Sequence, residues 1–235
     1  MTLTDLKVFI YHLPDFILKF NFYRIRKIKQ YFKKNRIRKL QIGCGANIIS
    51  GWLNTDISLY VCRRGAIYMD ASKKFPLPDN SIDYIYSEHI FEHLSYEQGV
   101  SMLKECYRVL KHDGVIRLAT PNLQFLMELY SNPTKEINQQ YIEWSTNSFL
   151  NRNINEKSAV YVINNFHTSW GHKIIYDYNT IANLFKSIGF CDITSCEIGT
   201  STQESLKNIE HHQFIIPEKF NQLESLIIEA KVKHE

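Results

Sequence analysis

The segment SEHIFEHL, residues 87–94, carries the residues best suited to chemistry: two histidines and a glutamate close together. His89 and His93 are four residues apart and Glu92 directly precedes His93, so a helical segment would place both imidazoles on one face. A neutral imidazole oriented by a carboxylate can take a proton from a hydroxyl group near pH 7. The spacing HxxEH is also that of inverted zinc proteases, in which two histidines hold zinc and the glutamate acts as the base.

A second group of residues has the pattern of a nucleotide-binding site. The turn Gly43-Cys44-Gly45 follows a short apolar run, and two glycines after a strand let the backbone approach a ligand closely. Asp56 closes the next run, where a carboxylate could accept both hydroxyls of a ribose. Asp70-Ala71 follows the run after that, where a carboxylate could accept the exocyclic amine of an adenine. We therefore expect a ligand across the ends of successive strands.

Strands and helices that alternate along the chain position these residues. Apolar runs predict strands at 40–42, 66–69, 83–86, 115–119, 191–198 and 224–232. Ser95 and Gln98 form a capping box that begins a helix, and Asp113-Gly114 is expected to end it. A second helix runs up to Gly189, and residues 121–175 are expected to be an insertion with helical pieces. The alternation predicts an α/β fold with a mostly parallel sheet.

The spacing after the glycine turn argues against a dinucleotide-binding site. Such a site needs a third glycine and a full helix whose N-terminus binds the pyrophosphate. The third glycine position holds Asn47, and only eleven residues separate Gly45 from Asp56. We therefore expect the first helix to be truncated or replaced by a loop.

The chain resembles class I S-adenosylmethionine-dependent methyltransferases in the motifs LQIGCG, GWLNTDIS, YMDASKKFPLPDNSIDYIYSEHIFEHL, LKECYRVLKHDGVIRLATPNL and ESLIIEAKV. It is most similar to a small bacterial group often associated with cell-surface polysaccharide synthesis, over roughly residues 38–232. The resemblance implies a Rossmann-like fold: a seven-stranded, mostly parallel sheet with an antiparallel last strand and the cofactor above the first two strands.

By the same resemblance, S-adenosylmethionine is the expected cofactor. Its expected ligands are Gln41, Gly43, Cys44, Gly45, Asp56, Asp70, Ala71 and Ser87. Two positions depart from the family's pattern, since Gln41 stands where an acid is usual and Asn47 where a third glycine is usual. Both side chains can still hydrogen-bond, so weakened cofactor binding is a more natural expectation than its loss.

The resemblance also places the SEHIFEHL segment beside the methyl group to be transferred. For a hydroxyl acceptor we expect His89, His93 and Glu92 to be catalytic: an imidazole takes the proton, and no metal is obligatory. His172 and Tyr176 are expected at the acceptor side as substrate-binding residues. A zinc protease is disfavoured because the segment lies inside a long methyltransferase-like run.

A metal site stays open as an alternative. Some O-methyltransferases that act on quinones or small-RNA ends hold a divalent metal with an acid followed by a Glu-His pair. In this chain His89 would replace the acid, and His167 or His172 would complete the site.

Positive charge is concentrated at the N-terminus. Residues 1–39 hold 11 Lys or Arg and only Asp5 and Asp15 as acids, a net charge of +9, whereas the rest of the chain has a net charge of −5. We expect a basic, aromatic arm at 1–39 that contacts an anionic membrane, attached to a methyltransferase domain at 40–235. Nucleic acid is disfavoured as a partner by the negative body. Amphipathic helices that pack on the body are the alternative for the arm.

The number and spacing of the cysteines indicate the cellular compartment of the protein. There are five, an odd number, and none forms a CxxC pair, which disfavours a disulfide framework and a zinc ribbon. The apolar run at 8–14 is too short to span a membrane. We expect a cytoplasmic protein, held at the inner membrane surface by its arm.

The leading functional interpretation is a methyltransferase that O-methylates a sugar of a cell-surface polysaccharide or of its precursor. A second interpretation keeps the cofactor and makes a quinone, another small metabolite or RNA the acceptor. A third is a non-catalytic cofactor-binding protein, which the departures at Gln41 and Asn47 would suit.

Overall fold

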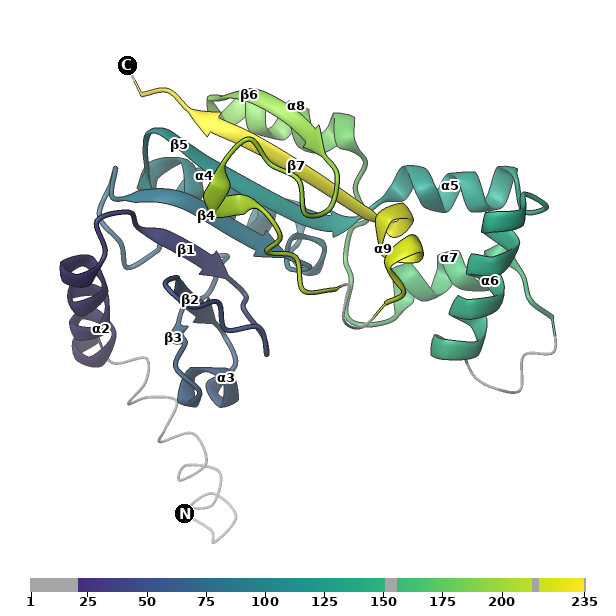
Figure 1. Ribbon diagram of the computed structural model, residues 1–235, viewed down its shortest axis with the longest axis horizontal. Helices are drawn as coiled ribbons and strands as arrows, with labels where there is room; N and C mark the ends of the chain where they lie inside the picture. Colours follow the sequence, from purple (N-terminus) through teal and green to yellow (C-terminus); the bar gives the residue numbers. More distant parts are fainter. Residues whose placement is uncertain (1–20, 151–155, 213–215, 235) are drawn as a thin grey trace, which may run out of the picture.

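A seven-stranded sheet forms the centre of the protein in the computed structural model, which describes residues 21–150, 156–212 and 216–234. The strand order is β3-β2-β1-β4-β5-β7-β6 (Figure 1). β7 runs antiparallel to both of its neighbours, and the other pairs are parallel, which confirms the predicted Rossmann-like α/β fold. The strands are β1 (Lys39–Ile42), β2 (Leu53–Asp56), β3 (Ile67–Tyr68), β4 (Ile82–Glu88), β5 (Leu110–Pro121), β6 (Phe190–Cys196) and β7 (Ser225–Val232).

Helices connect the strands and cover the sheet. They are α2 (Asn21–Lys34), α3 (Leu59–Arg63), the 3₁₀ turn η1 (Phe91–His93), α4 (Tyr96–Val109), α5 (Leu123–Ser131), α6 (Glu136–Phe149), α7 (Ala159–Thr168), α8 (Tyr178–Ile188), the 3₁₀ turn η2 (Glu204–Leu206) and α9 (Glu218–Glu224). α5, α6, α7 and α9 gather beyond the carboxyl ends of β4 and β5, whereas α2 lies at the other end of the sheet, near the start of β1 (Figure 1). Among the described residues, no helix is both long and apolar enough to cross a bilayer.

The connection from β1 to β2 has no helix. Residues 43–52 form turns and bends only, so the predicted truncation of the first helix is confirmed. A short helix, α3, follows β2 instead, and the glycine turn is left open at the carboxyl end of β1.

The helix α4 begins as predicted and ends earlier than predicted. Ser95 Oγ accepts from the Gln98 N–H, and the Gln98 side chain accepts from the Ser95 N–H at 2.9 Å, which completes the capping box. The predicted end at Asp113-Gly114 is wrong, because the helix stops at Val109. Leu110 is fully buried and pairs with Ile82 in the sheet, so the chain has already left the helix there.

The insertion at 121–175 contains α5, α6 and α7, in line with the helical pieces expected there. Together with α9 these helices bury a hydrophobic cluster of their own, separate from the cluster under the sheet. The former is centred on Phe125, Leu129, Tyr141, Phe166 and Phe220. Among the described residues, the two largest hydrophobic cores therefore lie in different places, one under the sheet and one among the helices beyond its carboxyl edge.

The described part of the basic arm packs on the body. Ile28 of α2 is buried in the core of the sheet. The hydroxyl of Tyr31 accepts a hydrogen bond from the Lys39 N–H at 2.8 Å and donates one to the Gly51 carbonyl at 3.1 Å. One face of α2 is thus fixed to the start of β1, which leaves its basic residues on the outer face.

A buried charge network lies on β5. Arg117 is fully buried and forms ion pairs with Glu210 and Glu229. Its guanidinium also donates to the carbonyls of Glu197 and Thr200, so the segment that follows β6 is anchored over the sheet. Glu210 is therefore engaged with Arg117, and the residues just after it continue toward the carboxyl end of β4.

Candidate active site

The glycine turn after β1 combines tight packing with open space. Gly43 and Gly45 both adopt the left-handed conformation, with φ of 66° and 49°. A Cβ at Gly43 would lie 2.1 Å from Ile90 Cδ1, so a side chain there would collide with Ile90. At Gly45 a Cβ would meet nothing within 4 Å. The turn therefore packs against the segment after β4 on one side and has room for a ligand on the other.

Asp56 holds this turn in place. It is buried at the end of β2, and its Oδ2 accepts from the Gly45 N–H at 2.8 Å while its Oδ1 accepts from the Ser58 N–H at 2.6 Å. Each carboxylate oxygen can still accept a second hydrogen bond. The structure thus brings together Gly45 and Asp56, as a shared cofactor site requires.

The remaining predicted cofactor ligands lie around the same edge. Cys44 donates its N–H to the Thr55 carbonyl at 2.9 Å, and burial raises the pKa of its thiol to about 12, so its backbone rather than its sulfur is suited to the site. Asp70, after β3, accepts from the N–H and hydroxyl of Ser72, and Ala71 packs against the sheet core.

Two of these predicted ligands have buried oxygens in need of a partner. Among the described residues, Gln41 Oε1 and Ser87 Oγ are buried without a hydrogen bond. Leaving such a group unpaired costs about 1–3 kcal/mol, which a ligand with suitable polar groups could offset. These oxygens and the open space at Gly45 fit a polar, nucleoside-containing cofactor.

The segment after β4 does not form the expected helix. His89 has φ of 50° and donates its N–H to the Ala119 carbonyl at 2.9 Å, so it extends the pairing of β4 with β5. Only Phe91–His93 turn, as η1. The prediction that His89 and His93 share a helical face is therefore wrong, although both line the cavity described below.

Glu92 orients His89 rather than its neighbour His93. Its fully buried carboxylate lies 3.0 Å from His89 Nδ1 and accepts from the Thr120 hydroxyl at 3.0 Å. Burial raises the pKa of Glu92, but the hydrogen bond and charge of His89 outweigh it and hold that pKa below its usual value. Burial likewise lowers the pKa of His89, and Glu92 raises it above its usual value overall. An ionised Glu92 accepts from Nδ1–H, so Nε2 of His89 is left to receive a proton.

A cavity of about 230 Å³ lies beside this pair. It is lined by His89, His93, Pro121, Phe149, Phe166, Trp170, His172, His212, Ile216 and Glu224. Its wall combines aromatic rings from the helical insertion with imidazoles and the carboxyl group at the end of α9. This composition suits a small acceptor with both apolar faces and hydrogen-bonding groups.

The two predicted substrate-binding residues differ in position. His172 lines the cavity and donates from Nδ1 to the Phe166 carbonyl at 2.7 Å; burial lowers its pKa, which keeps it neutral. Tyr176 lies outside this lining: it is buried and packs on Phe91, with ring centroids 4.9 Å apart. Tyr176 therefore packs against the η1 turn and does not line the space proposed for the acceptor.

Two titratable residues of the cavity were not assigned from the sequence, His212 and Glu224. The ring of His212 packs on that of His89, with ring centroids 3.9 Å apart. Burial, together with the charge of His89, lowers the pKa of His212 to about 3. The backbone N–H groups of residues 211–212 donate to Glu88, which fixes this segment to the end of β4. The doublet His211-His212 was the only signal in the sequence, and it does not reveal which elements it meets.

Burial raises the pKa of Glu224 to about 7, against the hydrogen bond from the Tyr141 hydroxyl, which lowers it. Since the folded pKa exceeds the unfolded value of 4.5, the stability from this group is complete below pH 4.5 and is lost as the pH rises through about 7. We expect Glu224→Gln to remove this loss, so that its free energy of unfolding relative to the wild type rises by roughly 2–3 kcal/mol between pH 5 and 8.5. Urea unfolding at both pH values measures the free energy of unfolding, and exposed Glu218→Gln is the matched control. Parallel pH profiles for Glu224→Gln and the wild type would contradict the assignment.

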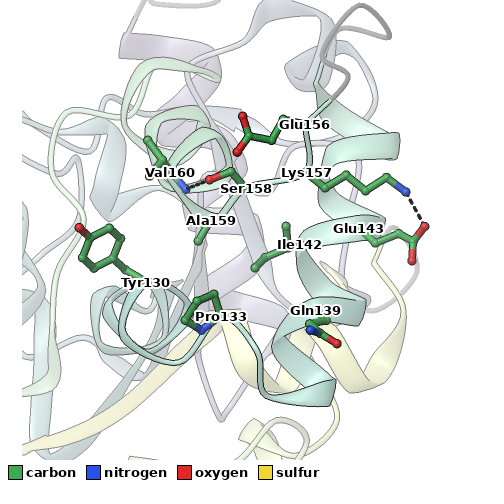
Figure 2. Close-up of a pocket in the computed structure, with 10 residues that line it drawn as sticks. All are labelled: Tyr130, Pro133, Gln139, Ile142, Glu143, Glu156, Lys157, Ser158, Ala159 and Val160. Carbon is green, nitrogen blue, oxygen red and sulfur yellow. Dashed lines mark hydrogen bonds and ion pairs between the residues drawn. The ribbon is translucent and has the colours of Figure 1, made fainter.

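A larger cavity, about 430 Å³, lies among α5, α6 and the start of α7 (Figure 2). Figure 2 shows its charged side chains at the rim, where Lys157 pairs with Glu143. It contains no histidine and none of the residues predicted from the sequence. The smaller cavity is therefore the better candidate for the acceptor.

Residues 40–118 match a protein family described as a methyltransferase domain, from β1 into β5. This stretch contains the glycine turn, Asp56, Asp70 and the segment from His89 to His93. This stretch is thus similar to a methyltransferase domain, in line with the prediction of a methyltransferase from the sequence. No curated protein matches the chain.

Solved structures of similar fold include a SAM-dependent methyltransferase from Archaeoglobus fulgidus, with 20% identity, 95% of this chain and 99% of that chain covered, and a TM-score of 0.47. A SAM-dependent methyltransferase from Thermotoga maritima, described as a possible histamine N-methyltransferase, has 14% identity, 97% and 99% coverage, and a TM-score of 0.48. Phosphoethanolamine N-methyltransferase 2 from Haemonchus contortus, in complex with S-adenosyl-L-methionine, has 14% identity, 85% and 49% coverage, and a TM-score of 0.44. All three descriptions name S-adenosylmethionine.

Proposed function

We propose that this methyltransferase transfers the methyl group of S-adenosylmethionine to a hydroxyl group of a sugar, within a cell-surface polysaccharide or its lipid-linked precursor. One observation favours a hydroxyl acceptor: in the His89–Glu92 pair a carboxylate orients an imidazole that lines the 230 Å³ cavity. Ile90, between them in sequence, packs on Gly43, so the proposed base is held against the turn that would bind the cofactor.

The residues of the cavity support a proton transfer to His89. When bound, S-adenosylmethionine supplies a methyl group on a sulfonium, so the electron pair of the broken carbon–sulfur bond stays on a neutral sulfur. The acceptor oxygen forms the new bond to the methyl carbon, and its proton goes to Nε2 of His89. Glu92 stays ionised and balances the imidazolium. Transfer to a hydroxyl is aided in this way because the oxygen loses its proton as the bond forms.

The wall of the cavity supports a sugar rather than a flat apolar acceptor. Phe149, Phe166 and Trp170 offer faces on which the CH groups of a pyranose can stack. His212 and Glu224 offer polar atoms for its remaining hydroxyls. A methyl-transfer assay with radiolabelled S-adenosylmethionine and a panel of free sugars, nucleotide-linked sugars, a quinol and RNA tests this proposal. Labelling of the sugars supports it, and labelling confined to the quinol or RNA contradicts it.

The cofactor half of the proposal is tested by Asp56→Ala. We expect calorimetry to find one site for S-adenosylmethionine in the wild type and an affinity lower by about 5–150-fold in Asp56→Ala, because charged hydrogen bonds worth about 1–3 kcal/mol are lost. Asp56→Asn keeps an acceptor for the Gly45 N–H and should lose less. Exposed Glu204→Ala is the control for a lost negative charge. Unchanged affinity in a folded Asp56→Ala would show that Asp56 is not a cofactor ligand.

We also propose that the basic face of α2 holds the enzyme against an anionic membrane surface, on the cytoplasmic side, where a lipid-linked acceptor would be presented. Residues 21–39 contain nine Lys or Arg and no acid, so they carry the whole positive excess of the N-terminal arm. Ile25, Arg26, Lys29 and Lys33 line a shallow, exposed depression on α2. Basic residues near anionic headgroups contribute about 1 kcal/mol each to binding.

A further inference from the structure

We propose that Glu92, His93 and His172 form a binding site for one divalent transition-metal ion, zinc in preference to magnesium, in the wall of the cavity. One ligand atom from each residue lies within 4.8 Å of the others. Two separate segments bring them together, and the backbone N–H groups of Lys173 and Ile174 donate to the Glu92 carbonyl at 2.7 and 3.2 Å. These hydrogen bonds hold the segment of Glu92 and His93 against the segment that carries His172.

The imidazole of His172 is oriented as a ligand. Its Nδ1–H donates to the Phe166 carbonyl at 2.7 Å, so the lone pair for a metal is on Nε2. Histidines that bind metals are commonly fixed in this way, through a hydrogen bond from the other ring nitrogen to a backbone carbonyl or carboxylate. The rings of His93 and His172 lie edge to face, with centroids 4.9 Å apart.

The carboxylate of Glu92 is positioned from both sides. His89 Nδ1–H and the Thr120 hydroxyl each donate to one carboxylate oxygen of Glu92 at 3.0 Å, and each oxygen keeps a further lone pair. Such outer contacts orient a metal-bound carboxylate. Glu92 can therefore serve the cation and His89 at once.

The donor set decides between metals. Two imidazoles and one carboxylate are the ligands of open zinc sites, whereas magnesium takes oxygen ligands and keeps its waters. Three protein ligands leave a coordination position free, and His93 and His172 both line the cavity, so that position faces the acceptor space. A role of the cation in binding the acceptor's hydroxyl rests on the proposed function, whereas cation binding itself does not. The sequence favoured a site without an obligatory metal and kept a metal site completed by His167 or His172 as the alternative, because it does not show which of these histidines meets Glu92 and His93.

The test uses the full chain, freed of metal with a chelator and titrated calorimetrically with zinc sulfate alone, without S-adenosylmethionine or acceptor. We expect one zinc per chain, and an affinity lower by at least about 100-fold in His93→Asn and in His172→Ala. Magnesium chloride should give no comparable binding. The alternative ligand His167 is exposed and lies outside the group of Glu92, His93 and His172, so His167→Ala is the matched control and should bind as the wild type does.

A second variant and a second measurement distinguish this site from zinc bound at a cysteine. Zinc should also raise the melting temperature of the wild type and of Cys62→Ser, which removes a buried thiol that contacts the Asp56 carbonyl. Zinc binding that is lost in Cys62→Ser and kept in both histidine variants would overturn the proposal, as would no zinc binding at all. Because the titration needs no methyl transfer, a wrong acceptor or a failed transfer assay leaves its result unaffected.

Discussion

His89→Asn lowers the rate of methyl transfer by roughly 10²–10⁴-fold at saturating S-adenosylmethionine, and the affinity for the cofactor stays close to that of the wild type. The proposed base is lost, while the contacts to the cofactor are kept. Asparagine is the better replacement than alanine, because His89 has φ of 50° and asparagine tolerates the left-handed region. Single-turnover rates with the sugar acceptor found in the panel measure the effect.

Two comparisons distinguish a catalytic base at His89 from a residue that only stabilises the fold. His93→Asn should lose less in the transfer step than His89→Asn in the presence of saturating zinc, because Glu92 contacts His89 and not His93. Exposed His112→Asn should lose nothing. If His89 is the base, His89→Asn should melt near the temperature of the wild type. If His89 only stabilises the fold, activity and melting temperature should fall together. Full activity in His89→Asn would rule out its role as the base.

The combined change Arg26→Glu, Lys29→Glu and Lys33→Glu reduces binding to vesicles that contain an anionic phospholipid by roughly 100-fold or more. Three favourable charges near the headgroups become unfavourable, and the buried contacts of Ile28 and Tyr31 are left intact. Vesicle sedimentation at low and physiological salt measures the partition coefficient, and binding of the wild type should weaken with salt.

The control for this variant carries the same change of charge elsewhere. Lys73, Lys104 and Lys186 are exposed on other elements, and their replacement by glutamate should leave vesicle binding nearly unchanged. Cofactor affinity should be that of the wild type in both triple variants, which shows that the body stays folded. Equal losses in the two triple variants would mean that net charge, and not the face of α2, governs binding.

Local patterns predicted much of the fold. The glycine turn, the capping box at Ser95 and the stop at Gly189 each depend on neighbouring residues only, and the structure contains all three. The end of α4 was misplaced because Leu110 leaves the helix to pair with Ile82, a contact that is not local. The partners of Arg117 are 93 and 112 residues away, so a cation inside a strand could not be assigned from its neighbours.

The candidate site was predicted in part for the same reason. His89, Glu92 and His93 lie within one short segment, so their grouping was visible in the sequence. Which histidine Glu92 meets depends on how far β4 extends and on the backbone of His89, and the helical pattern assumed there gave the wrong pairing. His212 and Glu224 join the cavity through contacts more than 100 residues away in the chain, such as that of Glu88 with His212.

The two separate cores have an evolutionary consequence. His89, Glu92 and the glycine turn are built on the sheet and its core, whereas Phe149 and Phe166 belong to helices that bury a cluster of their own. Substitutions in different clusters that share no contacts have nearly additive effects on stability. Selection can therefore exchange the aromatic wall, and with it the molecule that is methylated, while the machinery that delivers the methyl group is inherited unchanged.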